Sequence, residues 1–305
     1  MAHVPVLLKE TVEALNPRRG ETLVDGTVGG GGHLSVLLER MNGGGRFVAM
    51  DLDEKNLSSA REMIENKYPQ AEQHWIKGNY ADTLATLKFL GIEAADMLLL
   101  DLGFSSEHLE SGRGFSFLKP EEALDMRYND SIGATAADIV NGSTESELEN
   151  IFKKYGEEKF AKKAAREIVQ ARKGKKIKFV GQLLEVIKHS VPSRGRVNPA
   201  TRIFQALRIA VNDELGNLER VLADLPSIMS ADGRVAIISF HSLEDRMVKN
   251  AFRDLSKTGR AELIFKKPAA ASPGERRINP RSRSAKLRAI KMTSKAGKIK
   301  TNNKK

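Results

Sequence analysis

Four short apolar runs in the first hundred residues most constrain how this chain can fold. They lack the polar alternation of half-exposed strands, and helical patterns separate them. Strands that are buried on both faces have this pattern, because helices cover both sides of a parallel sheet. The expected strands span 21–25, 46–51, 74–77 and 96–101, and the expected helices span 33–40, 54–66 and 83–90. The sequence therefore predicts a doubly wound α/β fold, which binds ligands at the carboxyl ends of its strands.

The strand pattern stops near residue 109 and returns more than a hundred residues later. The intervening stretch is helical, and it leads into one long helix that we expect over 202–225. After it we expect strands at 233–240, 261–266 and 286–292, with a helix at 243–255. The simplest organisation is one α/β domain interrupted by a helical insertion between its fourth and fifth strands. The predicted boundaries are 1–108 and 201–293 for the α/β domain, 109–200 for the insertion and 294–305 for a basic disordered tail.

The net charge of +11 is concentrated at the C-terminal end of the chain. Residues 272–305 hold twelve Lys or Arg and a single acid, Glu275. The remaining residues contain equal numbers of acids and bases. A polyanion such as nucleic acid is the natural partner of such a segment, and a solvated tail is the alternative explanation.

Composition excludes several classes of protein. The chain has no run of 18 apolar residues, which argues against a membrane partner, and its first residues lack a secretory signal pattern. Cysteine is absent, so disulfides, thiolate metal sites and a cysteine nucleophile are excluded. These features fit a cytoplasmic protein.

A glycine-rich loop, Asp25-Gly-Thr-Val-Gly-Gly-Gly-Gly-His33, follows the first expected strand and opens a helix. Glycines there let the backbone approach a ligand closely. The dinucleotide fingerprint needs glycines at its first, third and sixth positions, and no starting glycine satisfies it, since Val28 and Leu34 occupy required positions. A pyrophosphate-bound nicotinamide cofactor is therefore disfavoured.

Asp51 ends the second expected strand, 22 residues beyond Gly29. An acid at this place can accept hydrogen bonds from the ribose hydroxyls of an adenosine. A glycine loop without a phosphate pattern, together with a ribose-binding acid, points to S-adenosylmethionine. The alternative is that Asp51 caps the following helix and the glycines only make a turn.

Two further residues follow the expected strands. Asp101 ends the fourth strand, where a carboxylate can meet the methionine ammonium of the cofactor or the methyl acceptor, or else cap a helix. Tyr80 follows the third strand, where adenine stacking is expected, although a lone aromatic is more often part of a core.

Several longer motifs make the chain resemble the bacterial small-subunit ribosomal RNA cytosine-N4 methyltransferase family, or MraW family, over about residues 3–293. The motifs are His3-Val-Pro-Val-Leu-Leu8, the glycine loop to His33, Asp101-Leu-Gly-Phe-Ser-Ser106, Arg113-Gly-Phe-Ser-Phe117, Leu124-Asp-Met-Arg127, Tyr155-Gly-Glu-Glu158, Pro199-Ala-Thr-Arg202, Ser239-Phe-His-Ser-Leu-Glu-Asp-Arg246 and Arg281-Ser-Arg-Ser284.

The resemblance implies a Rossmann-like S-adenosylmethionine-dependent methyltransferase fold with an inserted helical domain, 109–200, for substrate recognition. It implies S-adenosyl-L-methionine as methyl donor and the N4 amine of a decoding-region cytidine in ribosomal RNA, within the small ribosomal subunit, as acceptor. The cofactor contacts it implies are Gly31, Gly32, His33, Asp51, Tyr80, Asp101 and His108. Tyr80 replaces the usual Phe of the family, and His108 stands where relatives often have Gln.

Cytosine N4 is a poor nucleophile, so its methylation needs an aligned amine and an acceptor for its proton. The Asn/Asp-Pro-Pro-aromatic turn of the best-known amino-methyltransferases is missing. Asp101 and Ser105 occupy the corresponding place. His241 is a further candidate, although a lone histidine is more often a structural, hydrogen-bonded residue. Side-chain and backbone oxygens both remain possible acceptors. The histidines show no paired spacing, so we expect no metal.

The basic segment and the Pro199–Arg202 motif supply the candidate RNA contacts, which are Asn198, Arg202, Arg281, Arg283, Lys286 and Arg288. Two other functions compete with RNA methylation. A non-catalytic RNA-binding or ribosome-assembly module would be favoured by a degraded cofactor loop, and a nicotinamide oxidoreductase by an intact dinucleotide fingerprint. The sequence shows neither feature.

Overall fold

The computed structural model describes residues 5–103, 109–129, 133–192 and 198–294. The chain divides into two compact units. The sheet unit comprises Met1–Gly103 and Gly216–Lys305, and the helical unit comprises Phe104–Leu215. The sequence-based boundary near residue 200 differs from the second junction, because α10 (Ala200–Asn212) packs against α7 (Glu145–Gly156) within the helical unit.

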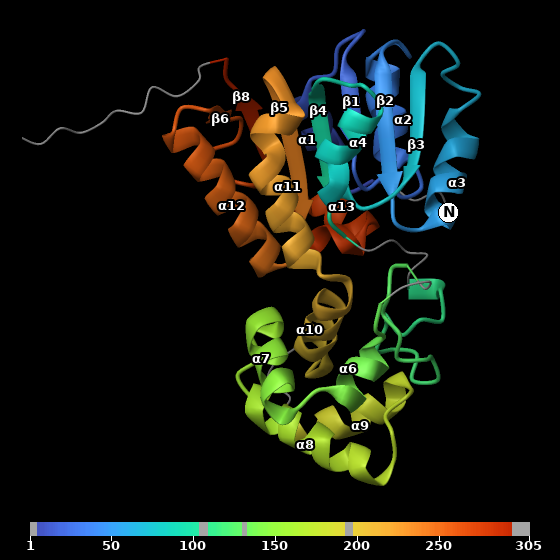
Figure 1. The fold of residues 1–305 in the computed structure, drawn as a ribbon, viewed down its shortest axis with the longest axis vertical. Coiled ribbons are helices and arrows are strands. Elements are labelled where there is room, and N and C mark those ends of the chain that lie inside the picture. The colour runs from blue at the N-terminus through green and yellow to red at the C-terminus, as the bar shows by residue number, and fades with distance from the viewer. Residues whose placement is uncertain (1–4, 104–108, 130–132, 193–197, 295–305) are drawn as a thin grey trace, which may run out of the picture. The chain divides into compact units, whose positions relative to one another are not determined.

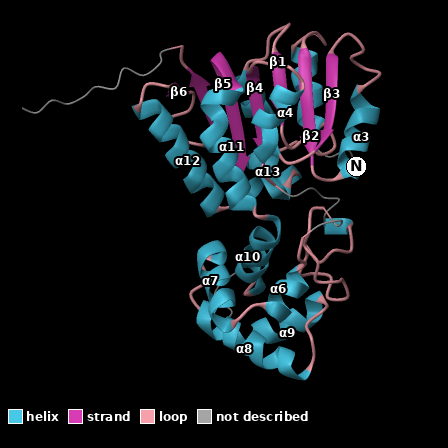
Figure 2. Cartoon of the chain, in the orientation of Figure 1, coloured by secondary structure: helices cyan, strands magenta, loops and turns pink. Residues whose placement is uncertain are grey.

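A mostly parallel sheet forms the centre of the sheet unit (Figures 1 and 2). Among the described residues its strand order is β3-β2-β1-β4-β5-β8-β6, with β7 paired to β8. β1 to β5 run parallel, whereas β8 is antiparallel to β5, β6 and β7. The strands are β1 (Thr22–Asp25), β2 (Arg46–Asp51), β3 (Glu72–Lys77), β4 (Ala95–Asp101), β5 (Met229–Ser239), β6 (Ala261–Leu263), β7 (Ala269–Ala270) and β8 (Lys286–Met292).

Helices cover both faces of this sheet, because successive side chains of its strands alternate between two buried cores. Leu23, Phe47 and Leu99 enter the core beneath α1, α2 and α3, whereas Val24 and Val48 enter the core beneath α4, α11 and α12. The doubly wound α/β fold expected from the sequence is confirmed. The helical elements of this unit are α1 (Leu8–Leu15), α2 (Gly32–Arg40), α3 (Glu54–Ile64), η1 (Tyr80–Asp82), α4 (Thr83–Phe89), α11 (Glu214–Ile228, from Gly216 on), α12 (Ser242–Lys257), α13 (Pro273–Ile278) and η2 (Pro280–Arg283).

The helical unit has a core of its own. Phe152, Ile168, Leu183 and Leu207 are buried together there, one from each of four helices. Thr135 and Thr144 start two of its helices with reciprocal capping boxes. Its helices are α6 (Ala136–Gly142), α7, α8 (Ala161–Gly174), α9 (Val180–Ser190) and α10.

The single long helix expected over 202–225 is wrong. Asp213 adopts a left-handed φ of 47°, which ends α10 at Asn212, and α11 begins at Glu214. A left-handed residue interrupts the helical backbone whatever the helix propensity of its neighbours. One residue therefore converts a continuous apolar periodicity into two helices.

The C-terminal part of the described chain completes the sheet unit through two contacts. β8 lies between β5 and β6, and the Glu275 carboxylate accepts a hydrogen bond from the Leu7 amide at 2.8 Å. Leu7 itself has a positive φ of 54°. The tail expected at 294–305 lies outside the described residues from residue 295 onward. None of the described helices combines the length and apolar character that a membrane crossing requires.

Candidate active site

The glycine loop begins tightly packed against β4. The Gly26 amide donates to the Leu99 carbonyl oxygen at 3.0 Å. A Cβ on Gly26 would lie 2.5 Å from Leu100 Cδ2 and 2.9 Å from Tyr80 Cβ. Carbon atoms cannot approach so closely, so only glycine allows the loop to pass between β4 and η1.

Further along, the same loop opens toward solvent. Gly29 and Gly31 have positive φ values of 50° and 81°. A Cβ on Gly31 would press on side chains of α3 at 3.1 Å, whereas nothing lies within 4 Å of a Cβ on the exposed Gly30. Gly32 then begins α2. The loop thus offers open backbone at Gly30, and Gly31 is held by packing.

Asp51 organises this loop from the end of β2. Its Oδ2 accepts from the Gly29 amide at 2.9 Å, and its Oδ1 accepts from the Asp53 amide at 2.8 Å and from Asn56 Nδ2 at 3.3 Å. Burial raises the pKa of Asp51, and these hydrogen bonds oppose that rise. The helix-cap alternative does not hold, because the side chain that caps α3 is Asp53, which accepts from the Lys55 amide.

Asp25 was not singled out from the sequence, although it ends β1 as Asp51 and Asp101 end β2 and β4. It is 1% exposed. Burial raises its pKa to about 7, a hydrogen bond from the Thr27 amide opposes this, and the charges of Asp101 and Asp51 add to it. The signal that could have found it is the shared position, since the carboxyl ends of adjacent parallel strands meet at one edge.

Asp101 lies on the other side of the loop. Its amide donates to Thr27 Oγ1 at 2.6 Å, and its Oδ2 lies 3.9 Å from His33 Nδ1. The Nε2 atom of the buried His33 ring lies 2.9 Å from the Val6 carbonyl oxygen. The three carboxylates therefore gather around one loop, and His33 ties that loop to the N-terminal segment.

The remaining predicted contacts are less defined. Tyr80 is half-buried and packs against the core on the α4 side of the sheet. Ser105, Ser106 and His108 lie outside the described residues. The roles of these four residues stay predictions.

A protein-family model matches residues 1–293 of this chain, and that model describes the MraW methylase family. The chain belongs to the MraW methylase family. The resemblance identified from the sequence motifs is thereby confirmed. The match includes the glycine loop and all three strand-end carboxylates.

Curated relatives of this MraW-family chain are named as ribosomal RNA methyltransferases. A protein from Dictyoglomus thermophilum named Ribosomal RNA small subunit methyltransferase H is 48% identical over 294 residues, which cover 94% of this chain and 95% of the relative. A protein of the same name from Clostridioides difficile is 40% identical over 305 residues, covering 94% and 97%.

Solved structures resemble this MraW-family chain more distantly. SMU.1697c from Streptococcus mutans, in complex with SAH, has a TM-score of 0.43 at 11% identity, covering 95% of this chain and 99% of that one. A SAM-dependent O-methyltransferase from Thermotoga maritima has a TM-score of 0.40 at 9% identity, covering 94% and 65%. At TM-scores this low, neither likeness bears on function.

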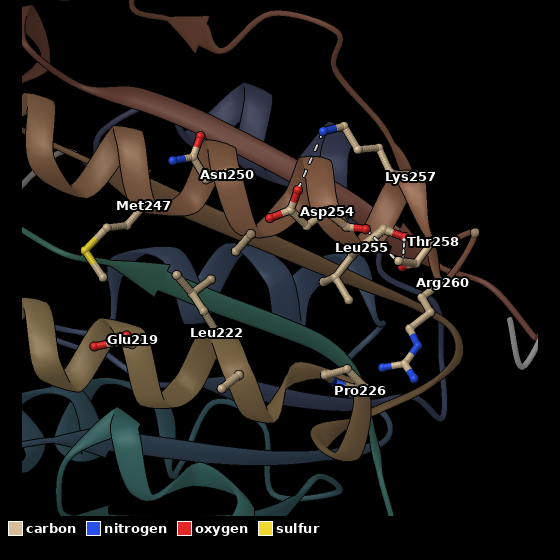
Figure 3. A pocket seen from close by; sticks show the side chains of 13 residues that line it. Glu219, Leu222, Pro226, Met247, Asn250, Asp254, Leu255, Lys257, Thr258 and Arg260 are labelled. Carbon is tan, nitrogen blue, oxygen red and sulfur yellow. Dashed lines mark hydrogen bonds and ion pairs between the residues drawn. The ribbon is translucent and has the colours of Figure 1, made fainter. Parts of the chain in front are cut away.

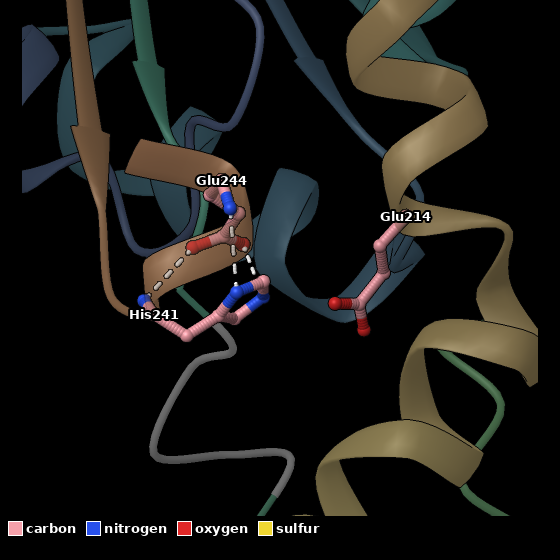
Figure 4. A group of neighbouring side chains, drawn as sticks. All are labelled: Glu214, His241 and Glu244. Carbon is pink, nitrogen blue, oxygen red and sulfur yellow. Dashed lines mark hydrogen bonds and ion pairs between the residues drawn. The ribbon is translucent and has the colours of Figure 1, made fainter. Parts of the chain in front are cut away.

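His241 begins α12 of the MraW-family chain, directly after β5. Its Nδ1 accepts from the Glu244 amide at 3.4 Å, while the Glu244 carboxylate accepts from the His241 and Phe240 amides (Figure 4). This reciprocal arrangement is a helix cap. The structure therefore gives His241 a structural role as a helix cap, and the catalytic role of His241 stays a prediction.

Lys286 and Arg288, two predicted RNA contacts, both face Asp245 of α12. Lys286 Nζ lies 3.0 Å and Arg288 Nε 2.7 Å from its carboxylate oxygens. Asp245 is buried, and hydrogen bonds from both cations hold its pKa below the usual range although burial opposes this. An internal ion pair satisfies these cations, so their availability to RNA is lower than the sequence suggested.

The other predicted RNA contacts occupy both units. Asn198 and Arg202 are exposed at the start of α10 in the helical unit, and the Asn198 side chain accepts from the Ala200 amide at 2.9 Å. Arg281 and Arg283 belong to η2 of the sheet unit, and Arg283 is exposed. All four stay predictions.

Proposed function

We propose that this chain transfers a methyl group from S-adenosylmethionine to the N4 amine of a cytidine in the decoding region of small-subunit ribosomal RNA. Family membership supports the reaction class, and the names of the curated relatives support the RNA substrate. The site observation that carries the proposal is the set of carboxylates of Asp25, Asp51 and Asp101 around one glycine loop. Ribosomal subunits as substrate put the reaction in the cytoplasm.

The described residues fit this cofactor chemically. The Asp51 carboxylate would accept hydrogen bonds from the ribose hydroxyls, and the open backbone at Gly30 would leave room for the ligand beside the loop. The methionine ammonium is a cation that the Asp101 carboxylate would stabilise, and its charge would also favour ionisation of Asp25, whose pKa burial raises to about 7. When bound, the cofactor supplies an electrophilic methyl group on a sulfonium.

The residues of the chain have to orient the amine and accept its proton. With the cofactor held by Asp51 and the loop at Gly30, the methyl group would pass from the sulfonium to N4, and the sulfur would keep the electron pair of the broken C–S bond. One N4 proton must then leave. Asp101 accepts a hydrogen bond from N4, which turns the amine away from ring conjugation and prepares this proton transfer. Ser105, which lies outside the described residues, is a further candidate for a polar contact with the amine.

Mass spectrometry of ribosomal RNA nucleosides tests the proposal directly. Cells that lack this gene should lose an N4-methylated cytidine from small-subunit RNA, and the wild-type gene should restore it. The matched control is a gene that encodes Asp101→Asn, which keeps the fold but removes the charge at the site. An unchanged nucleoside profile in the deletion strain would contradict the proposal.

A further inference from the structure

A small cleft lies at the far end of the sheet unit, between α12 and the segment that follows β6. Its volume is about 240 Å³, and its walls include Lys249 and Arg253 of α12, Lys266 and Lys267 after β6, and Phe265. We call these five residues the basic cleft. In Figure 1, α12 and β6 run side by side at this end of the sheet.

The charges of the basic cleft have one sign. No acidic side chain lines it, and its four cations take part in no ion pair within the described part of the chain. Lys249 and Arg253 are four residues apart on one helix, a spacing at which like charges repel. Arg288 also lines the cleft but differs from these four cations, since Asp245 already neutralises it. The cleft therefore holds unneutralised positive charge that an anion would relieve.

The groove between α11 and α12 provides an internal comparison (Figure 3). It carries acids as well as bases, namely Glu219 and Asp254 beside Lys257 and Arg260, and Lys257 Nζ lies 3.9 Å from Asp254 Oδ1. A groove of mixed sign selects neither polyanions nor polycations. Of these two depressions, only the basic cleft has the charge that nucleic acid requires.

Apolar surface accompanies the cations of the basic cleft. Phe265 is half-buried in its wall, and the neighbouring Leu263 is 41% exposed. A volume of about 240 Å³ is smaller than the roughly 300–1,000 Å³ of small-molecule pockets. The cleft therefore suits a local contact with a backbone phosphate and its attached nucleotide, rather than enclosure of a free ligand.

The sheet sets the position of the basic cleft relative to the strand-end carboxylates. β5 and β8 separate β4 from β6, so at about 4.8 Å per strand the cleft lies roughly 14 Å along the sheet from β4. At about 3.4 Å per nucleotide, the spacing along one strand of B-form DNA, that distance spans about four nucleotides. Its wall residue Arg288 is in register with Ile237, near the carboxyl end of β5.

We propose that the basic cleft binds backbone phosphates of the ribosomal RNA substrate, a few nucleotides from the base that is methylated. This inference rests on the proposed function, because RNA is the assumed substrate. It assigns RNA contact to α12 and the segment after β6, in place of the Asp245-paired cations of β8.

The test compares two variants that remove the same charges. Arg253→Ala/Lys267→Ala changes two exposed residues of the cleft, and Arg40→Ala/Lys88→Ala changes two exposed residues of α2 and α4. The probe is unmodified small-subunit ribosomal RNA transcript, bound at several salt concentrations. Each lost phosphate contact reduces the slope of log affinity against log salt by roughly 0.7–0.9. The cleft variant should therefore lose about 1.4–1.8 in slope, and the control variant should keep the wild-type slope.

Methyl transfer to unmodified small subunits is measured with the same preparations. The cleft variant should show a raised KM for subunits with kcat unchanged, and unchanged affinity for the cofactor by calorimetry. An equal slope change in both variants, or none in the cleft variant, would overturn the cleft proposal alone. Weakened binding to subunits but not to transcript would indicate a protein partner and would overturn it too. Absence of methyl transfer by the wild-type protein would instead contradict the proposed function.

Discussion

The strand-end carboxylates of the sheet unit and the half-buried Asp125 of the helical unit are treated in opposite ways. In the sheet unit, burial raises the pKa values of Asp25 and Asp51. In the helical unit, burial acts on Asp125 in the same direction, but hydrogen bonds from Arg127 outweigh it and hold the pKa of Asp125 below its usual value. A neighbouring cation neutralises Asp125, as two cations neutralise Asp245 of the sheet unit, whereas the strand ends keep carboxylates that a cationic ligand would stabilise. Buried carboxylates whose pKa is raised in this way are typical of functional sites.

The largest effect is expected at Asp101. Asp101→Asn keeps the size of the side chain but removes its charge and one acceptor, so methyl transfer should fall by about 10²-fold or more. The melting temperature should change little. The measurement is incorporation of tritiated methyl groups into unmodified small subunits at saturating cofactor. Near-normal turnover would remove Asp101 from the chemistry, and a collapse in stability would give it a structural role.

Asp25 should make the sheet unit less stable as pH rises. Its folded pKa of about 7 exceeds its unfolded value of 3.8, so between these values the folded state holds a proton that the unfolded chain has released. The free energy of unfolding therefore falls with rising pH in this window, by roughly 2–3 kcal/mol between pH 5 and 8. Asp25→Asn should lack this fall. Chemical denaturation at several pH values checks it, and parallel pH profiles would show that Asp25 does not titrate in this range.

Asp51 should matter for cofactor affinity. Asp51→Ala leaves the ribose hydroxyls poorly paired and frees the Gly29 amide that its Oδ2 holds at 2.9 Å. Binding of S-adenosylmethionine should weaken by roughly 1.5–3 kcal/mol, the range for charged hydrogen bonds. Calorimetry measures this, and circular dichroism checks the fold. Unchanged affinity in a folded variant would move the ribose site elsewhere.

Asp125 provides the contrasting case in the helical unit. Its two carboxylate oxygens accept from Arg127 Nε and Nη2, both at 2.8 Å. Asp125→Asn should lower the free energy of unfolding by about 1–2 kcal/mol near neutral pH, with cofactor affinity unchanged. Because the folded pKa of Asp125 is depressed, this stabilisation exists above pH 3.8 and is lost as pH falls through the folded pKa. If Asp125→Asn also weakened cofactor binding, the contrast between Asp125 and the strand-end carboxylates would be wrong.

Local sequence patterns predicted much of the sheet unit. Apolar strands buried on both faces, and acids at their ends, depend on neighbours in sequence, so Asp51 and Asp101 were found together with their strands. Asp25 could not be identified in this way, because its raised pKa comes from burial in the folded protein, which the sequence alone does not show. The pairing of Lys286 and Arg288 with Asp245 joins residues more than forty positions apart, and only the tertiary fold brings them together.

The helical unit was harder to predict at its boundary. The apolar period runs across Asp213 without interruption, whereas the helix ends there because of one left-handed backbone conformation.

The cap of α3 in the sheet unit was equally hard to predict, because an acid two residues before the cap position and an acid at the cap position look alike in sequence. Only the hydrogen bond to the Lys55 amide assigns the cap of α3 to Asp53 rather than to Asp51.

The position of β8 has a consequence for how the protein is made. On the ribosome, β5 is complete at Ser239, but the strand that covers its free edge ends at Met292. At roughly 5–20 residues per second, translation of that interval takes several seconds. During this time the nascent chain presents an open strand edge, the kind that promotes aggregation. The Glu275–Leu7 hydrogen bond also forms only after Glu275 has been made, so the sheet unit is finished only after its last strand, which ends at Met292, has been translated.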